Sequence, residues 1–277
     1  MSCNYPKSQS SCLESMQQCV TNIKSWMLSN KLKLNDDKTE VMFISSRYYQ
    51  KLIKLTDFTI DNIVIQPATS VRNIGVMFDG IMSMESQITS ICKSTHYHLR
   101  NIGRIRKCIT YEACEKLVHA LVTSRLDCGN ALLYGLPEFQ NYRLQKFLHI
   151  AARILTLTTL SNHITPILKE LQWLPIEKRI EYKIILLTFK SLHALAPQYI
   201  SELTMPYPTP RPLRSAGANY LAIPQSRTKT YGDRAFSVSA PTFWNGLPDE
   251  LRECHEIEPF KRHLKTFLFN SAYNVHD

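Results

Sequence analysis

The sequence predicts an α+β protein that is mainly α-helical. In about the first eighty residues, a stretch with helical spacing is followed by short apolar runs next to turn residues. These patterns predict one helix and a small sheet. Helical spacing then dominates up to residue 195, and a Pro-rich stretch follows it. The expected units are a helix with a small sheet over 1–83, a helical bundle over 84–196, a linker arm over 197–224, and a C-terminal helical region over 225–277.

Short segments with different periodicities predict the elements of the first unit. Apolar residues at spacings of three and four indicate an amphipathic helix, whereas short apolar runs next to turn residues indicate strands. The expected elements are a helix over 13–34, a mostly buried strand over 40–44, a hairpin of 58–60 and 63–65 about Asp61-Asn62, and a strand over 71–78 that contains Gly75.

Helical spacing recurs through the middle of the chain, with prolines near the expected boundaries. The expected helices cover 84–107, 111–123, 138–157, 163–171, 175–195 and 256–270. Six of the fourteen prolines lie between 197 and 224, which predicts an extended arm there. A turn is expected at 244–248, Trp-Asn-Gly-Leu-Pro, and no internal repeat is found.

The composition is that of an ordinary globular protein with a basic surface. Lys and Arg number 33 against 23 Asp and Glu, a formal net charge of +10. Such a surface favours a polyanionic partner, most often nucleic acid, although a solvated basic surface without a partner is the alternative. The polar start and the lack of a long apolar run predict an intracellular protein, cytoplasmic or nuclear, that is neither secreted nor inserted in a membrane.

The eight cysteines predict reduced thiols and no metal site. No Cys-x-x-Cys pair is present, and the nearest approach to zinc-ligand spacing is the set Cys92, His96, His98 and Cys108. Buried or surface thiols are the simpler interpretation of that set.

The segment 86–111 holds several cations and no acidic residue. On a helix, one face would carry Lys93, Tyr97, Arg100, Arg104 and Lys107. The opposite face would carry Ile88, Ile91, Cys92, Thr95, Leu99 and Ile102. An apolar face that docks and a cationic face at one-turn spacing suit binding to a phosphate backbone without sequence readout. A solvated basic face is the alternative.

Asp36-Asp37 is the one carboxylate pair that could suggest polymerase metal binding. Two-metal chemistry needs a further carboxylate from a separate strand, and the only earlier acid is Glu14. The residues before 35 continue a helical pattern, so the pair is better interpreted as a turn that leaves the helix. No phosphate-binding glycine loop, nucleophile elbow or His-Glu-x-x-His motif is present.

The run WMLSNKLKLNDDKTE at 26–40 strongly resembles reverse transcriptases of non-LTR retrotransposons of the jockey and chicken-repeat type. Further blocks follow in the family's order: VRNIGV (71–76), HLRNI (98–102), LVTSRLD (121–127), ALLYGLP (131–137), HITP (163–166), WLP (173–175), LHALAP (192–197), RAFS (234–237) and WNGLP (244–248). The likeness covers nearly the whole chain from about residue 15.

This resemblance implies the rear part of an RNA-directed DNA polymerase. Residues 1–83 resemble the end of the palm, and 84–196 resemble the thumb, which holds the template–primer duplex of RNA and DNA. Lys38 matches a lysine proposed to protonate departing pyrophosphate, with a surface lysine at a turn as the alternative. Ile74, Gly75 and Val76 resemble the element that grips the primer end, where glycine permits close backbone approach.

The chain departs from the family pattern in two ways. The aromatic-x-Asp-Asp hairpin, the fingers and the endonuclease of an intact element are expected upstream of residue 15, so this chain should be inactive alone. It needs no cofactor, whereas the parent enzyme needs Mg²⁺. Cys128-Gly129-Asn130 stands where the family carries Tyr-Cys-Asn. A sequence-tolerant nucleic-acid-binding module and an inert translated relic are the alternative interpretations.

Overall fold

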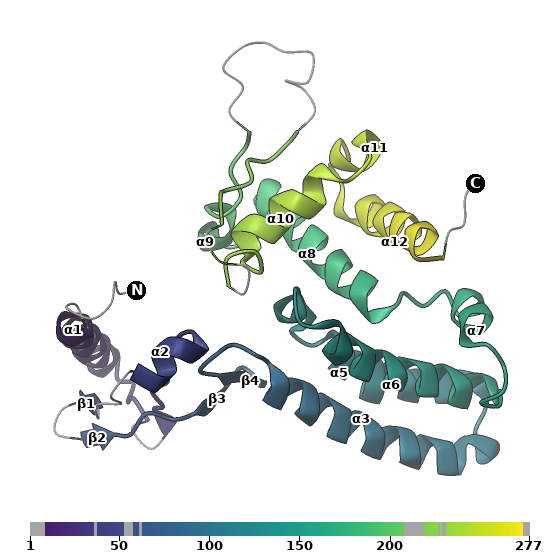
Figure 1. The fold of residues 1–277 in the computed structure, drawn as a ribbon, viewed down its shortest axis with the longest axis horizontal. Coiled ribbons are helices and arrows are strands. Elements are labelled where there is room, and N and C mark those ends of the chain that lie inside the picture. The colour runs from purple at the N-terminus through teal and green to yellow at the C-terminus, as the bar shows by residue number, and fades with distance from the viewer. Residues whose placement is uncertain are drawn as a thin grey trace. The chain divides into compact units, whose positions relative to one another are not determined.

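The computed structural model describes residues 9–35, 38–52, 58–60, 63–207, 219–226, 228 and 231–273. The chain divides into two compact units, Met1–Gln87 and Ile88–Asp277, each of which is described by itself (Figure 1). The described part is mainly helical and contains two antiparallel two-stranded sheets. The predicted α+β, mainly helical class is therefore confirmed.

The first unit combines helices with two β-hairpins. Its elements are α1 (Gln9–Ser29), α2 (Arg47–Leu52), β1 (Phe58–Ile60), β2 (Ile63–Ile65), β3 (Ser70–Asn73) and β4 (Val76–Asp79). β1 pairs with β2, which confirms the predicted hairpin, although its turn residues 61–62 lie outside the described part. Val41 is buried against Leu13 and Val20 of α1 and Ile65 of β2. A small cluster therefore holds the helix on the sheet.

Two strand predictions for this unit are wrong. Residues 40–44 form no strand, because the segment makes isolated backbone bonds rather than a ladder: Ala68 N to Val41 O, 2.8 Å, and Ser45 N to Gly80 O, 2.9 Å. Residues 71–78 form a hairpin, with β3 paired to β4 from Ser70↔Asp79 to Asn73↔Val76. Ile74 and Gly75, at φ +47° and +83°, are its two turn residues, a combination that typifies a type I′ turn.

The second unit is built from helices that follow the predicted spacing closely. They are α3 (Glu85–Ile105), η2 (Arg106–Cys108), α4 (Tyr111–Val118), η3 (His119–Thr123), α5 (Ser124–Asp127), η4 (Asn130–Leu133), α6 (Glu138–Thr156), α7 (Ile164–Glu170), α8 (Ile176–Leu192), α9 (Gln198–Ser201), α10 (Phe236–Asn245), α11 (Asp249–Arg252) and α12 (Ile257–Tyr273). η2 and η4 are 3-10 helices, and η3 is a π-helical turn.

Arginine side chains link α3 and α6, which run in the same direction (Figure 1). Near the start of both helices, Arg143 of α6 donates to Thr89 Oγ1 of α3 at 3.2 Å. Just beyond the end of α3, Arg106 donates to the Leu155 carbonyl at 2.9 Å and to the Ile154 carbonyl at 3.1 Å. These carbonyls lie in the last turn of α6, where no intrahelical donor remains for them.

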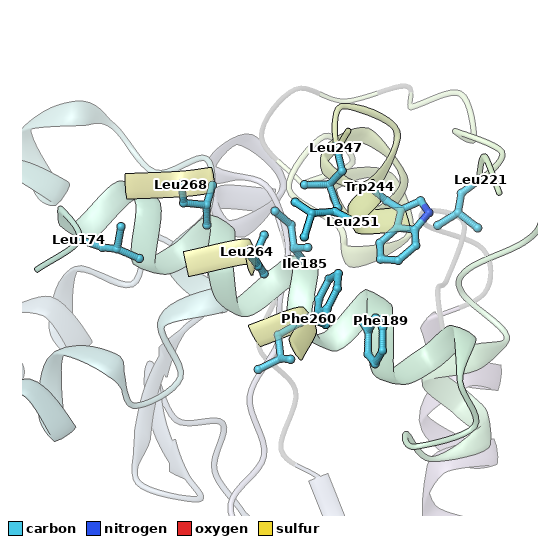
Figure 2. Packing of buried hydrophobic residues seen from close by; sticks show 11 residues of the cluster. Leu174, Ile185, Phe189, Leu221, Trp244, Leu247, Leu251, Phe260, Leu264 and Leu268 are labelled. Carbon is cyan, nitrogen blue, oxygen red and sulfur yellow. The ribbon is translucent and has the colours of Figure 1, made fainter. Parts of the chain in front are cut away.

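An extended core joins α8 to the last three helices. Figure 2 shows Phe189 of α8 stacked on Phe260 of α12, with ring centroids 4.1 Å apart, and Trp244 of α10 beside them. The other buried members are Leu174, Ile185, Leu186, Leu221, Leu247, Leu251, Leu264 and Leu268. The regions predicted as a helical bundle and as a C-terminal region therefore share this core.

Sequence spacing missed α10 and interpreted its end as part of a turn. Trp244 and Asn245 close this helix, and only the residues that follow form the turn. Pro241 lies inside the helix, which removes one backbone donor and obscures the helical pattern. In the predicted arm, residues 205–207 pair with 220–222 through bonds such as Tyr207 N to Tyr220 O, 2.9 Å. Residues 208–218 lie outside the described part.

Candidate nucleic-acid interface

The start of α3 is fixed by side chains of the preceding turn. The Asp79 carboxylate accepts backbone N–H groups of Ile81 (3.1 Å), Ser83 (2.8 Å) and Met84 (2.8 Å). Gln87, buried in the first turn of α3, accepts the Met77 N–H of β4 at 2.9 Å. Because these bonds use polar groups that would otherwise be buried without partners, they hold the helix at a defined starting point.

One face of α3 is buried as the periodicity predicts. Ile88, Ile91, Thr95, Leu99 and Ile102 are all buried, while Cys92 is half-buried. Burial raises the pKa of the Cys92 thiol, against the opposing effect of the nearby Arg143 charge. The thiol is therefore held in its neutral form, which fits packing better than metal binding.

The opposite face carries the predicted cations. Lys93, Arg100 and Arg104 are exposed, and Tyr97 is 64% exposed. At 1.5 Å per residue, Lys93 and Arg104 lie about 16 Å apart along the helix. None of these cations forms an ion pair with a carboxylate among the residues that the structure describes. Their charge is therefore uncompensated locally. We call Lys93, Tyr97, Arg100, Arg104 and Lys107 the α3 cationic face.

The last turn of this face differs from a continuous α-helix. α3 ends at Ile105, and Lys107, which is exposed, lies on the 3-10 helix η2. Arg106 is 9% exposed and binds backbone carbonyls at the end of α6. It also donates to the Ile109 carbonyl at 3.2 Å. Arg106 is therefore a structural residue rather than part of the basic surface.

A groove between α3 and α6 adjoins Arg100. This cavity of about 290 Å³ is lined by His96, Leu99, Arg100, Gly103, Phe147, Ile150 and Ile154. The rings of His96 and Phe147 lie 6.5 Å apart. A cation beside apolar and aromatic side chains combines charge with a surface on which a planar base can stack.

The sequence did not predict this groove, because all site residues expected in the second unit lie on 93–107 and none lies on α6. The buried series of α6 runs through Leu144, Leu148, Ala151 and Leu155. Phe147 and Ile150, the latter 41% exposed, fall outside that series. Phe147 and Ile150 lie outside the buried apolar stripe of α6, and such extra apolar residues could have indicated this groove from the sequence.

The surface near His98 adds another cation. Burial, and secondly the charge of Arg125 on α5, lower the pKa of His98. Arg125 is exposed. Near neutral pH, the positive charge at this point therefore comes from the guanidinium rather than from the imidazole.

The remaining predicted site residues belong to the first unit. Lys38 is exposed on a turn after α1, and its N–H donates to the Asn35 carbonyl at 3.2 Å. Residues 36 and 37 lie outside the described part. Ile74 is 94% exposed and Val76 is buried. Gly75 would meet nothing within 4 Å if it carried a Cβ, so its positive φ explains the glycine.

Metal-ligand clusters and membrane-spanning helices are both absent from the described residues. These residues contain no group of three His, Cys, Asp or Glu side chains that could hold a metal ion. Within the same ranges, no helix has the length and apolar character needed to cross a membrane.

The residues brought together on the second unit are thus the α3 cationic face and the adjoining groove. This arrangement can neutralise backbone phosphates and offer a stacking surface. Comparison with known proteins gives no family to set beside this geometry: no family model, curated protein or solved structure matches the chain.

Proposed function

We propose that this chain is the rear portion of a non-LTR retrotransposon reverse transcriptase, and that its α3 cationic face holds template–primer nucleic acid. The observation that carries the proposal is one helix with a buried apolar face and an exposed cationic face that forms no ion pair with any described carboxylate. The ordered sequence blocks between 26 and 248 support the same assignment.

The physical basis is counterion release. Each phosphate neutralised by Lys or Arg frees condensed ions, so affinity falls as salt concentration rises. Side chains spaced at one helical turn contact phosphates without reading bases, as an enzyme that copies any sequence requires. The groove lined by His96 and Phe147 lies beside Arg100 and offers a surface for an unpaired base at the end of a duplex.

In this proposal the first unit is the end of the palm and the second unit contains the thumb. Lys38 lies close to departing pyrophosphate in the parent enzyme, and Ile74, Gly75 and Val76 contact the primer end. The chain by itself does not polymerise, because the paired metal ions of this chemistry need carboxylates from two strands. A primer-extension assay that detects Mg²⁺-dependent synthesis by the purified chain contradicts this part of the proposal.

The same helix face also fits a second function, a sequence-tolerant nucleic-acid-binding module without any part in polymerisation. The two functions share the α3 cationic face and differ in preferred ligand. Preference for an RNA–DNA hybrid with a recessed end favours the polymerase fragment, whereas equal binding to all nucleic acids favours the module. No measurable binding to any of them leaves an inert relic.

The α3 cationic face is tested by charge reversal with a matched control. Arg100→Glu/Arg104→Glu removes two phosphate contacts, so affinity for a hybrid duplex should fall roughly tenfold or more near physiological salt. The slope of log K against log salt should lose about two units in magnitude. Fluorescence anisotropy at several salt concentrations measures both quantities.

Lys116→Glu/Arg262→Glu is the control, because both residues are exposed, lie on α4 and α12, and change the net charge equally. It should alter binding little. Equal losses in the two double variants would mean that only total charge matters, which contradicts a defined interface on α3.

A further inference from the structure

The outer side of α6 is apolar where a surface helix is normally polar. α6 buries one stripe of side chains in the core, and at helical spacing the opposite face carries Phe139, Tyr142, Lys146 and Ile150. All four are exposed, Phe139 by 60% and Tyr142 by 57%. Charged residues usually fill this face of an amphipathic helix, so two large aromatic side chains and an isoleucine there indicate a surface that meets a partner. We call these four residues the α6 exposed stripe.

The α6 exposed stripe and the α3 cationic face border one groove. Arg100 of the α3 cationic face and Ile150 of the stripe both line the cavity of about 290 Å³ between the two helices. The apolar side chains of Leu99 and Ile154 line the same cavity. A ligand in this groove therefore meets cations on its α3 side and apolar or aromatic side chains on its α6 side.

The two helices are in register along the groove. Their contacts join Thr89 to Arg143 and the ring of His96 to that of Phe147, so partners lie about fifty positions apart. Because α3 and α6 run in the same direction, each residue of α3 is level with the residue of α6 about fifty positions later (Figure 1). By this register Lys146 is level with the start of the α3 cationic face. The two rows thus run beside each other over several turns.

Both rows combine an aromatic ring with a cation. On α6, the Lys146 ammonium lies 4.6 Å from the centroid of the Tyr142 ring. On α3, the exposed Tyr97 lies between Lys93 and Arg100. None of these cations forms an ion pair with a carboxylate of the described residues. Rings beside uncompensated cations match a ligand that repeats a planar group and a negative charge.

We propose that α3 and α6 together bind a single-stranded segment of nucleic acid, with its phosphates along the α3 cationic face and its bases against the groove and the α6 exposed stripe. This inference rests on the proposed function, because it uses the same α3 face, and it adds that the segment bound across both helices is unpaired. In a duplex the bases stack on one another, so outer aromatic side chains cannot reach their faces. In a single strand those faces are open to Tyr142 and Phe139.

Three RNA–DNA hybrids test the class of ligand by fluorescence anisotropy of the full chain. They are a blunt duplex, the same duplex with a single-stranded RNA overhang of about eight nucleotides, and that overhang in abasic form. The natural overhang should raise affinity at least tenfold over the blunt duplex, through stacking and added phosphates. The abasic overhang has the same charge and no bases, so it should lose most of this gain. Equal affinity for the natural and abasic overhangs overturns the proposal.

Tyr142 is the residue whose substitution tests the α6 side. Tyr142→Ala should weaken the overhang hybrid about tenfold, which is the effect of one lost stacking contact, and leave the blunt duplex unchanged. The slope of log K against log salt should stay the same, because no charge is removed. Tyr142→Phe keeps the ring and should bind as the original chain does. Since Tyr142 is exposed, the midpoint of thermal unfolding should not change.

Tyr199→Ala is the matched control, because Tyr199 is 68% exposed and lies on α9, away from both rows. It should bind every hybrid as the original chain does. An unchanged affinity in Tyr142→Ala, or an equal loss in Tyr199→Ala, contradicts the proposal.

Failure of this inference can be distinguished from failure of the proposed function. If Arg100→Glu/Arg104→Glu weakens all three hybrids and Tyr142→Ala weakens none, the α3 interface stands and the single-strand site is wrong. If no hybrid binds, both are wrong. Phosphatidylserine vesicles and an acidic amphipathic helical peptide serve as the other probes. Binding of either that depends on Tyr142, without binding of the overhang, would assign the surface to a membrane or a protein and overturn the proposal.

Discussion

The two units bury their apolar side chains to very different extents. In the first unit, Trp26 is 63% exposed and Ile74 is 94% exposed, and the described cluster around Val41 is small. In the second unit, Trp244 is 1% exposed and Phe260 is fully buried within an extended core. Both units contain amphipathic helices, so periodicity alone does not determine how much of an apolar stripe finds a partner.

This difference teaches what stabilises each unit. Burial of apolar area is the main favourable term in folding, and the second unit obtains far more of it. α1 keeps Met16, Ile23 and Trp26 exposed along its predicted apolar stripe. The first unit should therefore open more readily than the second, and the following experiments test that comparison.

Hydrogen exchange should give the largest contrast. The described amides of residues 39–80 are bonded within two short hairpins and the six-residue helix α2 and otherwise make isolated backbone bonds, so they should exchange through local opening. Amides of α6 and α8 should exchange only near the global unfolding free energy, typically ~5–15 kcal/mol. Mass spectrometry of quenched peptides measures this difference. Equal protection in 39–80 and in the helices would mean that the hairpins share the stability of the second unit.

Core truncation should give the next largest contrast. Phe260→Ala removes the ring that stacks on Phe189, and such changes cost about 3–5 kcal/mol. Val41→Ala, at the buried centre of the first unit's cluster, should cost about 1–2 kcal/mol. Urea unfolding followed by tryptophan fluorescence, to which the buried Trp173 and Trp244 contribute the unfolding signal, reports on the first change, and hydrogen exchange of peptides from 39–80 reports on the second. Similar losses in both units would contradict the comparison.

Neighbouring arginines in the second unit should behave in opposite ways. Arg106→Ala leaves carbonyls at the end of α6 without a donor, which should cost about 1–3 kcal/mol of stability. Arg104→Ala, at an exposed position two residues earlier, should change stability by less than about 0.5 kcal/mol. Thermal unfolding measures both. Nucleic-acid binding should weaken in Arg104→Ala. Loss of stability in Arg104→Ala, with loss of binding alone in Arg106→Ala, would show that Arg106 belongs to the surface.

The smallest predicted effect is a pH dependence within the second unit. Burial, assisted by the charge of Arg153, lowers the pKa of His149 below its unfolded value near 6.5. The unfolded chain then binds more protons, so this contribution to stability is present above pH 6.5 and is lost as pH falls toward the folded pKa. His149→Gln should make stability less sensitive to pH below 6.5. An unchanged dependence in urea titrations would exclude His149 as a source.

Much of the helical structure and the hairpin of 58–60 and 63–65 were predictable from sequence, whereas the other two strand predictions were wrong. α6 and α12 lie within a few residues of their expected bounds, because a long apolar stripe at helical spacing fits a helix and does not fit a strand. The 40–44 strand failed because a strand needs a partner ladder that apolar residues alone cannot specify. The 71–78 prediction failed because Gly75 was taken as a strand interior, although glycine after Ile74 also permits a tight turn.

The candidate site was predictable in its charge and not in its surroundings. Helical spacing placed Lys93, Arg100 and Arg104 on one exposed face. It could not show that Arg106 turns inward, since that depends on where α6 ends. The groove between His96 and Phe147 joins residues about fifty positions apart, and no local pattern reports such proximity.

The arginine links between α3 and α6 have a consequence for molecular selection. Arg143 of α6 bonds to α3 near one end of the pair, and Arg106, just beyond the end of α3, bonds to α6 near the other, so the distance between the two helices is set before any ligand arrives. A partner that fits this fixed spacing binds without the entropy loss of ordering the surface. The helix pair cannot adjust its spacing to a partner of another width, so such a partner binds more weakly. The fixed spacing therefore selects partners by shape, whereas the positive charge alone would attract any polyanion.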